Sequence, residues 1–214
     1  MKFILLLREV LKLSLNKYYA LLIIIIFLTG CQKKSSDQIP INSKPFYNYN
    51  TILNKVRSLL NTEDGIVLMG NFKGDTTQQA AALIDVNKKQ EMISFNLIEI
   101  KDTIFEKKFE TQPLQGSLKG CKTEKINLPG IANDLIYYNS QIYFMGSNSG
   151  EVFAYLIDFK IQKTYYAHFL SESGKPGYLY ISEAENKEIR KYFIDNFRKD
   201  YPAFRIIPKD RVLN

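Results

Sequence analysis

The sequence predicts a mainly β fold of the α+β class: an antiparallel meander or a partly closed barrel, with a short N-terminal helix and a C-terminal helix near 183–198. Three observations predict it. Short apolar segments of strand length follow one another through the middle of the chain. The connections between them are short and turn-like, Asn139-Ser140 among them, which favours antiparallel neighbours over parallel crossovers. Phe and Tyr, at 14 residues each, are types that pack well on a pleated surface.

The first element of the folded part is expected to be a short helix that ends near Leu60. Asn50 or Thr51 is the candidate N-cap. Asn61–Gly65 then ends the helix, because Asp-Gly is a strong turn signal. The apolar positions at helical spacing are Ile52, Val56, Leu59 and Leu60.

Nine strands are expected after this helix, and apolar and polar residues partly alternate in two of them, as in a sheet with one face in water. A last edge strand is expected at Phe204–Ile207, before Pro208. The nine are Ile66–Gly70, Ala80–Val86, Met92–Ile100, Thr103–Glu110, Asp134–Asn139, Gln141–Met145, Glu151–Asp158, Thr164–Leu170 and Tyr178–Ile181.

The C-terminal helix is predicted by a capping box, in which the Ser182 hydroxyl and the Glu185 carboxylate each satisfy a free backbone amide. Pro202 ends the helical pattern after Phe197 or Arg198. The apolar stripe of this helix consists of Ile189, Tyr192, Phe193 and Phe197.

The N-terminus carries an apolar run at residues 21–27 that is too short to span a bilayer by itself, with Lys17 before it. It ends in Leu28-Thr29-Gly30-Cys31, which resembles the lipobox of bacterial lipoprotein precursors. The resemblance implies cleavage between Gly30 and Cys31 and attachment of diacylglycerol to the Cys31 thiol. The alternative is a plain transmembrane anchor in which Cys31 is incidental.

This resemblance divides the chain into a signal peptide (1–30), a lipidated cysteine with a flexible tether (31–48) and a single strand-rich domain (49–214). The tether is polar and contains Pro40 and Pro45. The resemblance also implies a destination: an aspartate after the cysteine retains such lipoproteins in the inner membrane, and because Gln32 stands there, the outer membrane, on its periplasmic face, is expected. In a Gram-positive host it would be the extracytoplasmic face of the cell membrane.

The charge balance argues against a nucleic-acid partner. The full chain carries +7, and loss of residues 1–30 removes four basic residues and one acidic residue, which leaves +4. The remaining basic residues are interspersed with acidic ones, whereas nucleic-acid binders concentrate them in a stripe. The partners expected are the lipid bilayer, through acylated Cys31, and an envelope protein or polymer.

Few residues suggest catalysis, and no metal or cofactor is expected. The single histidine, His168, is interpreted as a strand residue with a structural hydrogen bond; Ser171-Glu172-Ser173 follows it without a motif. Cys121 lies near Lys122 and Lys125, which could lower its pKa, but an incidental or buried cysteine is favoured. The carboxylate pairs Asp195 with Asp200 and Glu99 with Asp102 are interpreted as surface charge.

The loop at residues 70–79 resembles, in degenerate form, the calcium loops of FG-GAP-type repeats. Calcium requires oxygen ligands at alternate positions, and Lys73 occupies one of these, with Asp75 as the one remaining carboxylate. We therefore expect a strand-turn-strand without calcium. The alternate positions are Asn71, Lys73, Asp75, Thr77 and Gln79.

Three functions remain open. The leading one is a non-enzymatic binding or structural module of the cell envelope. The second is an inhibitor or immunity-type lipoprotein with one cognate toxin or enzyme, and the third is a hydrolase that uses His168 or Cys121. Aromatic residues could line a ligand or partner surface, although core packing explains at least half of them: Tyr137, Tyr138, Tyr143, Phe144, Phe153, Tyr155, Tyr165 and Tyr166.

Overall fold

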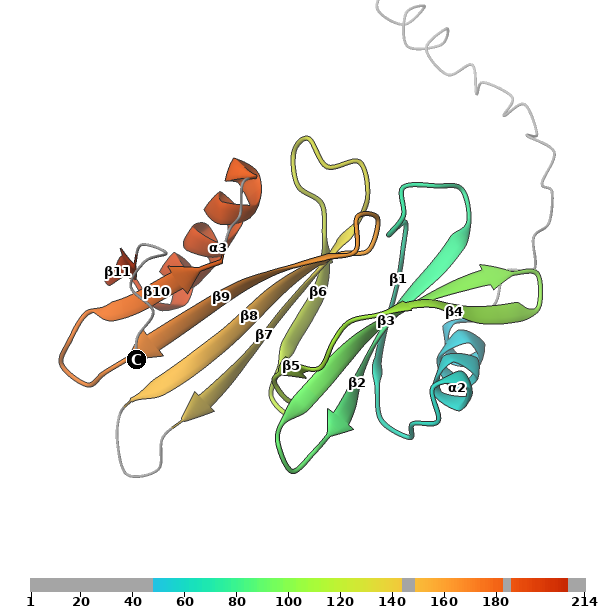
Figure 1. Ribbon diagram of the computed structural model, residues 1–214, viewed down its shortest axis with the longest axis horizontal. Coiled ribbons are helices and arrows are strands. Elements are labelled where there is room, and N and C mark those ends of the chain that lie inside the picture. The colour runs from blue at the N-terminus through green and yellow to red at the C-terminus, as the bar shows by residue number, and fades with distance from the viewer. Residues whose placement is uncertain (1–47, 144–148, 183–185, 208–214) are drawn as a thin grey trace, which may run out of the picture. The chain divides into compact units, whose positions relative to one another are not determined.

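A computed structural model describes residues 48–143, 149–182 and 186–207, which form a mainly β structure with two helices (Figure 1). The predicted fold class is confirmed in its meander form, because the described strands build two open, largely antiparallel sheets and no closed barrel. All described residues belong to one compact unit. The elements are α2 (Tyr49–Leu59), β1 (Ile66–Gly70), β2 (Gln78–Asn87), β3 (Met92–Lys101), β4 (Ile104–Glu110), β5 (Leu114–Gln115), β6 (Lys122–Ile126), β7 (Leu135–Tyr143), β8 (Gly150–Asp158), β9 (Lys163–Ser171), β10 (Gly177–Ile181), α3 (Lys187–Asp200) and β11 (Phe204–Ile207).

The first sheet contains β1 to β4 in chain order, with the two-residue β5 added beside β3. All its pairings are antiparallel. Short turns permit this arrangement. In the β3–β4 turn Asp102 has a φ of +52°, a conformation that aspartate tolerates better than most residues.

The second sheet contains β6 to β10 in antiparallel order, and β11 joins β10 in parallel after the chain has passed through α3. Two sequence predictions are corrected here. Asn139 and Ser140 were expected to form a turn, but they lie within the continuous strand β7, where both pair with β8. Strands β5 and β6 were not predicted.

Successive side chains of a strand point to opposite faces of a sheet, and the buried residues accordingly form three clusters. One lies between the two sheets and includes Phe95 and Tyr138. On the other face of the first sheet, α2 packs through Val56. On the other face of the second sheet, α3 packs through Phe193. The layers are therefore helix, sheet, sheet and helix.

Both helices start at residues other than the predicted ones. The side chain of Asn48, before the candidates Asn50 and Thr51, accepts a hydrogen bond at the start of α2. The predicted capping box is wrong: α3 begins at Lys187, with Asn186 as N-cap. Ser182 instead extends the sheet, because its hydroxyl accepts from the Tyr166 N–H at 2.9 Å. Glu185 lies outside the described residues.

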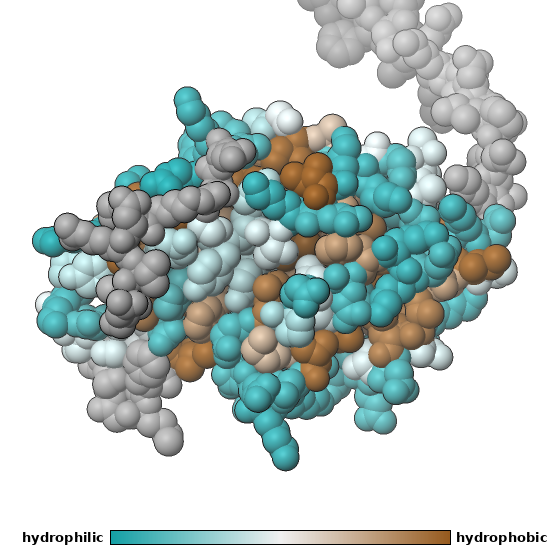
Figure 2. Space-filling view, in the orientation of Figure 1, coloured by the Kyte–Doolittle hydropathy of each residue, from teal (hydrophilic) through white to brown (hydrophobic). Residues whose placement is uncertain are grey.

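Among the described residues, no helix has the length and apolar character needed to cross a membrane. The surface in Figure 2 is mostly hydrophilic, with apolar side chains scattered among the polar ones. The tip of the β3–β4 hairpin carries one of the exposed apolar residues, Ile104, which is 67% exposed.

Candidate functional site

The residues of the N-terminal motif, Leu28-Thr29-Gly30-Cys31, lie outside the described part of the chain, as do the signal segment and almost all of the tether. Their predicted roles therefore stay predictions. The remaining candidates from the sequence are the loop at residues 70–79, His168, Cys121, the carboxylate pairs and the aromatic run. The structure assigns each of these a definite environment.

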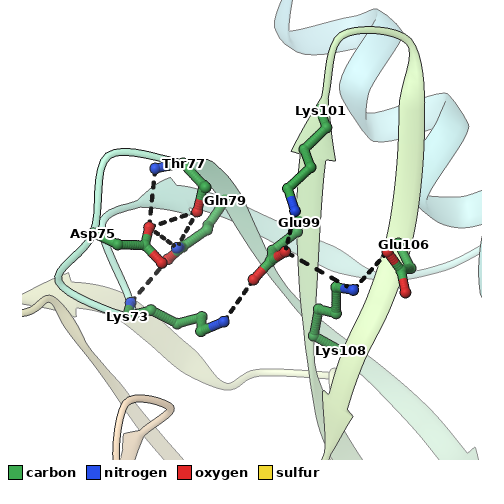
Figure 3. Close-up of polar contacts among 8 residues, drawn as sticks. All are labelled: Lys73, Asp75, Thr77, Gln79, Glu99, Lys101, Glu106 and Lys108. Atoms are coloured by element: carbon green, nitrogen blue, oxygen red, sulfur yellow. Dashed lines mark hydrogen bonds and ion pairs between the residues drawn. The ribbon is translucent and has the colours of Figure 1, made fainter.

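The loop at residues 70–79 is organised by Asp75. Its Oδ1 accepts hydrogen bonds from the Thr77 N–H and hydroxyl and from the Gln79 amide (Figure 3). Gln79 is fully buried, and its other amide atom, Oε1, accepts from the Lys73 N–H at 2.9 Å. The hydrogen bonds from Thr77 hold the pKa of Asp75 below its usual range. The polar side chains of the loop thus bind one another.

Lys73 extends from this loop to Glu99 on β3 (Figure 3). The Lys73 Nζ lies 2.6 Å from a Glu99 carboxylate oxygen, and the Glu99 side chain is only 6% exposed. Lys101 and Lys108 also approach this carboxylate, at 3.5 and 4.0 Å. The hydrogen bond from Lys73 lowers the pKa of Glu99. The ammonium group of Lys73 therefore supplies a positive charge to the carboxylate next to the loop.

These contacts show what the residues at the alternate positions of the calcium-like pattern bind in the structure. Thr77 and Gln79 donate to Asp75, Lys73 binds Glu99, and the backbone N–H of Asn71 donates to Asp134 at 2.7 Å. Within the described residues, no cluster of three His, Cys, Asp or Glu side chains is placed to hold a metal ion. The absence of calcium stays a prediction. Through these contacts the loop holds the β1–β2 connection against β3 and Asp134.

These carboxylates predict a stability that falls in acid. Asp75, Glu99 and Asp134 have lowered pKa values; burial alone would raise that of Asp134, but hydrogen bonds from Asn71 and Asn127 and the charge of Lys125 outweigh it. A carboxyl group whose pKa is lower in the folded state stabilises the fold at pH values above its unfolded pKa, which is near 4. This stabilisation is lost as the pH falls through the pKa of the folded state.

We therefore expect the urea concentration at the midpoint of unfolding to decrease when the pH is lowered below about 4, because these carboxylates are then protonated. Glu99→Gln should cost at most about 2 kcal/mol at pH 7, because Lys73 is partly solvated, and it should reduce the loss on acidification. Urea unfolding between pH 3 and 7 measures both effects. The control is Glu63→Gln, which alters an exposed carboxylate outside the network. Equal acid sensitivity of Glu99→Gln and wild type would contradict the assignment.

His168 lies on β9, where its Nε2 is 2.8 Å from a carboxylate oxygen of Glu151 on β8. Its ring stacks on Phe153, with centroids 4.7 Å apart. The hydroxyl and acid that follow it in sequence are used elsewhere: Ser171 donates to the Gly150 carbonyl, and Glu172 pairs with Lys175. His168 thus has the hydrogen-bond partner expected of a histidine in a strand.

Cys121 precedes β6 and is half-buried. Its Sγ is 3.4 Å from the Leu118 carbonyl oxygen and 3.7 Å from the Thr123 hydroxyl. Burial raises the pKa of the thiol, so the neighbouring lysines do not activate it. The suggestion of a lowered thiol pKa is therefore wrong.

The aromatic run is divided between the two faces of the second sheet. Tyr137 and Tyr165 belong to the cluster under α3. Tyr138, Tyr155 and Tyr166 form a stack across β7, β8 and β9 on the opposite face, with ring centroids 5.9 and 5.6 Å apart. These rings mainly pack against one another and against the core. The side chains of Tyr143 and Phe144 lie outside the described residues.

A polar cavity of about 160 Å³ lies between β7 and the last turn of α3. On the α3 face of β7, Tyr137 is followed at alternate positions by Asn139 and Gln141. From the helix, Asn196 and Asp200 line the same cavity. Polar side chains therefore meet at a place where both elements otherwise present apolar residues to each other.

One buried group of the cavity, the Asn196 amide, makes no hydrogen bond of normal length through its Nδ2. The Asn139 amide donates to the Tyr137 hydroxyl at 3.0 Å, and the Gln141 amide donates to the Tyr201 hydroxyl at 2.9 Å. Burial raises the pKa of Tyr137 to about 12, so its hydroxyl stays protonated. Asn196 is only 7% exposed, and its Nδ2 makes no hydrogen bond of normal length among the described residues, although its amide lies close enough to the Tyr137 hydroxyl to lower the pKa of that group.

Sequence reasoning missed this site, although a signal for it exists. Asn139 was assigned to a turn, which hid the alternation of Tyr137, Asn139 and Gln141 on one strand face. In α3, Asn196 lies three residues after Phe193 and directly before Phe197, so it falls within the apolar stripe. Of the pair Asp195 and Asp200, only Asp200 lines the cavity, and both side chains are exposed. A polar residue within an apolar stripe is the signal.

Comparisons of the chain with protein-family models, with curated proteins and with solved structures find no match. Function is therefore inferred from the residues of the site and from the N-terminal motif. The cavity offers amide donors and acceptors, a carboxylate, a lysine and tyrosine rings. Such a set can bind and orient a polar molecule by hydrogen bonds and ring contacts.

Proposed function

We propose that the mature protein is a lipid-anchored binding module of the cell envelope, without enzymatic activity. Lipid on Cys31 attaches it to the membrane, by default the periplasmic face of the outer membrane, and the tether at residues 32–48 holds the domain away from the bilayer. The domain binds an envelope component through the cavity between β7 and α3.

The observation that carries the binding role is the polar cavity itself. Burying the Asn196 Nδ2 without a hydrogen bond of normal length costs folding free energy, which an acceptor from another molecule would recover. The surroundings of His168 and Cys121 favour binding over hydrolysis, because the Ser171 hydroxyl donates to the Gly150 carbonyl and burial raises the pKa of the Cys121 thiol. The anchor is supported by the match of Leu28-Thr29-Gly30-Cys31 to the lipobox pattern.

The anchor is tested by labelling cells with an alkyne-bearing palmitate. We expect the wild-type protein to incorporate the label and Cys31→Ser to incorporate none, because only the Cys31 thiol carries the diacylglycerol. Two or three acyl chains should also keep the wild type in the membrane fraction. Cys121→Ser is the matched control, because it removes the chain's other cysteine, and it should label like the wild type. An unlabelled wild-type protein would contradict the anchor.

The binding role is tested by crosslinking in cells, with tagged wild type beside Cys31→Ser. A set of envelope contacts that depends on the anchor would support a binding module placed at the membrane. A single stoichiometric protein partner, whose toxicity the lipoprotein relieves, would instead favour the inhibitor or immunity function. Recovery of identical contacts from Cys31→Ser would show that membrane attachment does not place the domain.

A further inference from the structure

The cavity between β7 and α3 contains a buried donor, the Asn196 Nδ2, that makes no hydrogen bond of normal length among the described residues. Asn196 occupies a buried position in the apolar stripe of α3, directly before Phe197. A leucine there would contact the sheet without an unsatisfied polar group. Buried amides without a full hydrogen bond are rare in folded proteins, so the Asn196 Nδ2 is a donor that an acceptor from outside the described residues could satisfy in this cavity.

The volume of the cavity limits the size of the ligand. At about 160 Å³, it is close to cavities of about 150 Å³ that hold one benzene ring in other proteins. It therefore has room for one six-membered ring, and a longer molecule would have to extend into solvent. The ring of Tyr201, which is partly exposed, forms part of the lining, and it offers apolar contact to the face of such a ring.

The charges of the cavity favour a neutral ligand. Among the described residues that line it, the one lysine is Lys122, which is 3.2 Å from Glu124 and lies over the Tyr137 ring. The one acidic residue of this described lining, Asp200, offers a carboxylate that can accept from a hydroxyl group. One lysine, already paired, and one aspartate do not form the cationic site that a phosphate requires. The remaining polar groups are amides and phenols, which both donate and accept.

We propose that this cavity binds a single sugar residue: a six-membered ring whose hydroxyls accept from the Asn196 Nδ2 and donate to Asp200, while one ring face lies against tyrosine. The proposal rests on the proposed binding function and specifies its ligand class. The same chemistry is offered by a free monosaccharide and by the terminal residue of an envelope glycan.

The first test measures sugar binding to the lipidated full-length mature protein in a detergent without a sugar headgroup. Saturation-transfer NMR with glucose, galactose and N-acetylglucosamine should show contact with at least one of them. Asn196→Leu should weaken binding at least about tenfold, the value of one hydrogen bond of about 1.4 kcal/mol. Asp200→Asn should also weaken it, whereas Asp195→Asn, on the same helix but outside the cavity, should bind like the wild type.

Thermal unfolding of Asn196→Leu provides a second readout that a purely structural asparagine would not give. Because leucine removes an unsatisfied buried amide, its Tm should equal or exceed that of the wild type although binding is lost. A lower Tm, with or without loss of binding, would show that Asn196 is a structural residue. Failure of all three sugars to bind the wild type would overturn the ligand class.

A third measurement distinguishes the two possible sources of the sugar ring, a free monosaccharide and the end of a glycan. Retention of the protein on purified peptidoglycan sacculi, competed by the free sugar, would identify a glycan end as the ligand, whereas binding of the free sugar alone would identify a monosaccharide. Palmitate labelling at Cys31 does not depend on any of these results. Failure of the sugar proposal is therefore distinguishable from failure of the proposed anchor.

Discussion

Truncation of Tyr138 to alanine is expected to lower the free energy of unfolding by about 3–5 kcal/mol, because it empties the centre of the cluster that joins the two sheets. Tyr138 is fully buried on β7. Its ring packs edge-on against Phe95 of the first sheet, with centroids 5.7 Å apart, and stacks on Tyr155 of the second. Urea unfolding at pH 7 measures the loss.

The hydroxyl of Tyr138 contributes separately to the same contact. It accepts from the Ser117 N–H at 2.8 Å and donates to the Ser117 carbonyl at 2.9 Å, which holds the β5–β6 connection against the sheet. A Cβ at Gly116 would overlap this hydroxyl, so the backbone approaches it closely. Tyr138→Phe should therefore cost about 1–3 kcal/mol, less than Tyr138→Ala.

The pair of variants distinguishes the ring from the hydroxyl, and it also tests cooperativity. Because the cluster takes residues from both sheets, unfolding should be one transition followed equally by tyrosine fluorescence and by circular dichroism. Two separate transitions would show that the sheets unfold independently. Equal losses in Tyr138→Phe and Tyr138→Ala would contradict the packing role of the ring.

Local pattern identified most of the strands, because turn residues between short apolar segments restrict the chain to a meander. It failed at β7, where the turn propensity of Asn139 and Ser140 was outweighed by pairing with a neighbour on each side: Asn139 pairs with Lys122 of β6 and Ala154 of β8. Strand β6 also escaped prediction, because its lysines and glutamate resemble a loop.

The sequence alone could not predict which side chains lie on which face of a sheet. Tyr137 and Tyr138 are neighbours of one residue type, yet one faces α3 and the other faces the first sheet. The sequence does not state which layer covers which face, so it could not predict that Asn139 and Asn196 meet in one cavity. The same holds for Lys73 and Glu99, which lie 26 residues apart and meet only because β3 runs beside the β1–β2 loop.

The second large effect is expected at Phe169, whose ring joins β9 to the elements that close the cavity. Its centroid lies 5.4 Å from that of Phe197, 4.2 Å from that of Tyr201 and 6.0 Å from that of Phe204. Phe169→Ala should lower the free energy of unfolding by about 3–5 kcal/mol. Sugar binding should weaken in the same variant, because Tyr201 loses the ring against which it packs.

Gly177 on β10 permits a test of this geometry that does not depend on the size of either single effect. A Cβ at Gly177 would overlap the Phe169 ring, so Gly177→Ala should cost about 1–3 kcal/mol in the wild type through overpacking. In the Phe169→Ala background the ring is gone, and the same substitution should cost little. The double variant should thus be more stable than the sum of the single effects predicts, by about 1 kcal/mol or more. Strict additivity in urea unfolding would mean that the ring does not lie over Gly177, and the wall of the cavity formed by Phe197 and Tyr201 would then need another support.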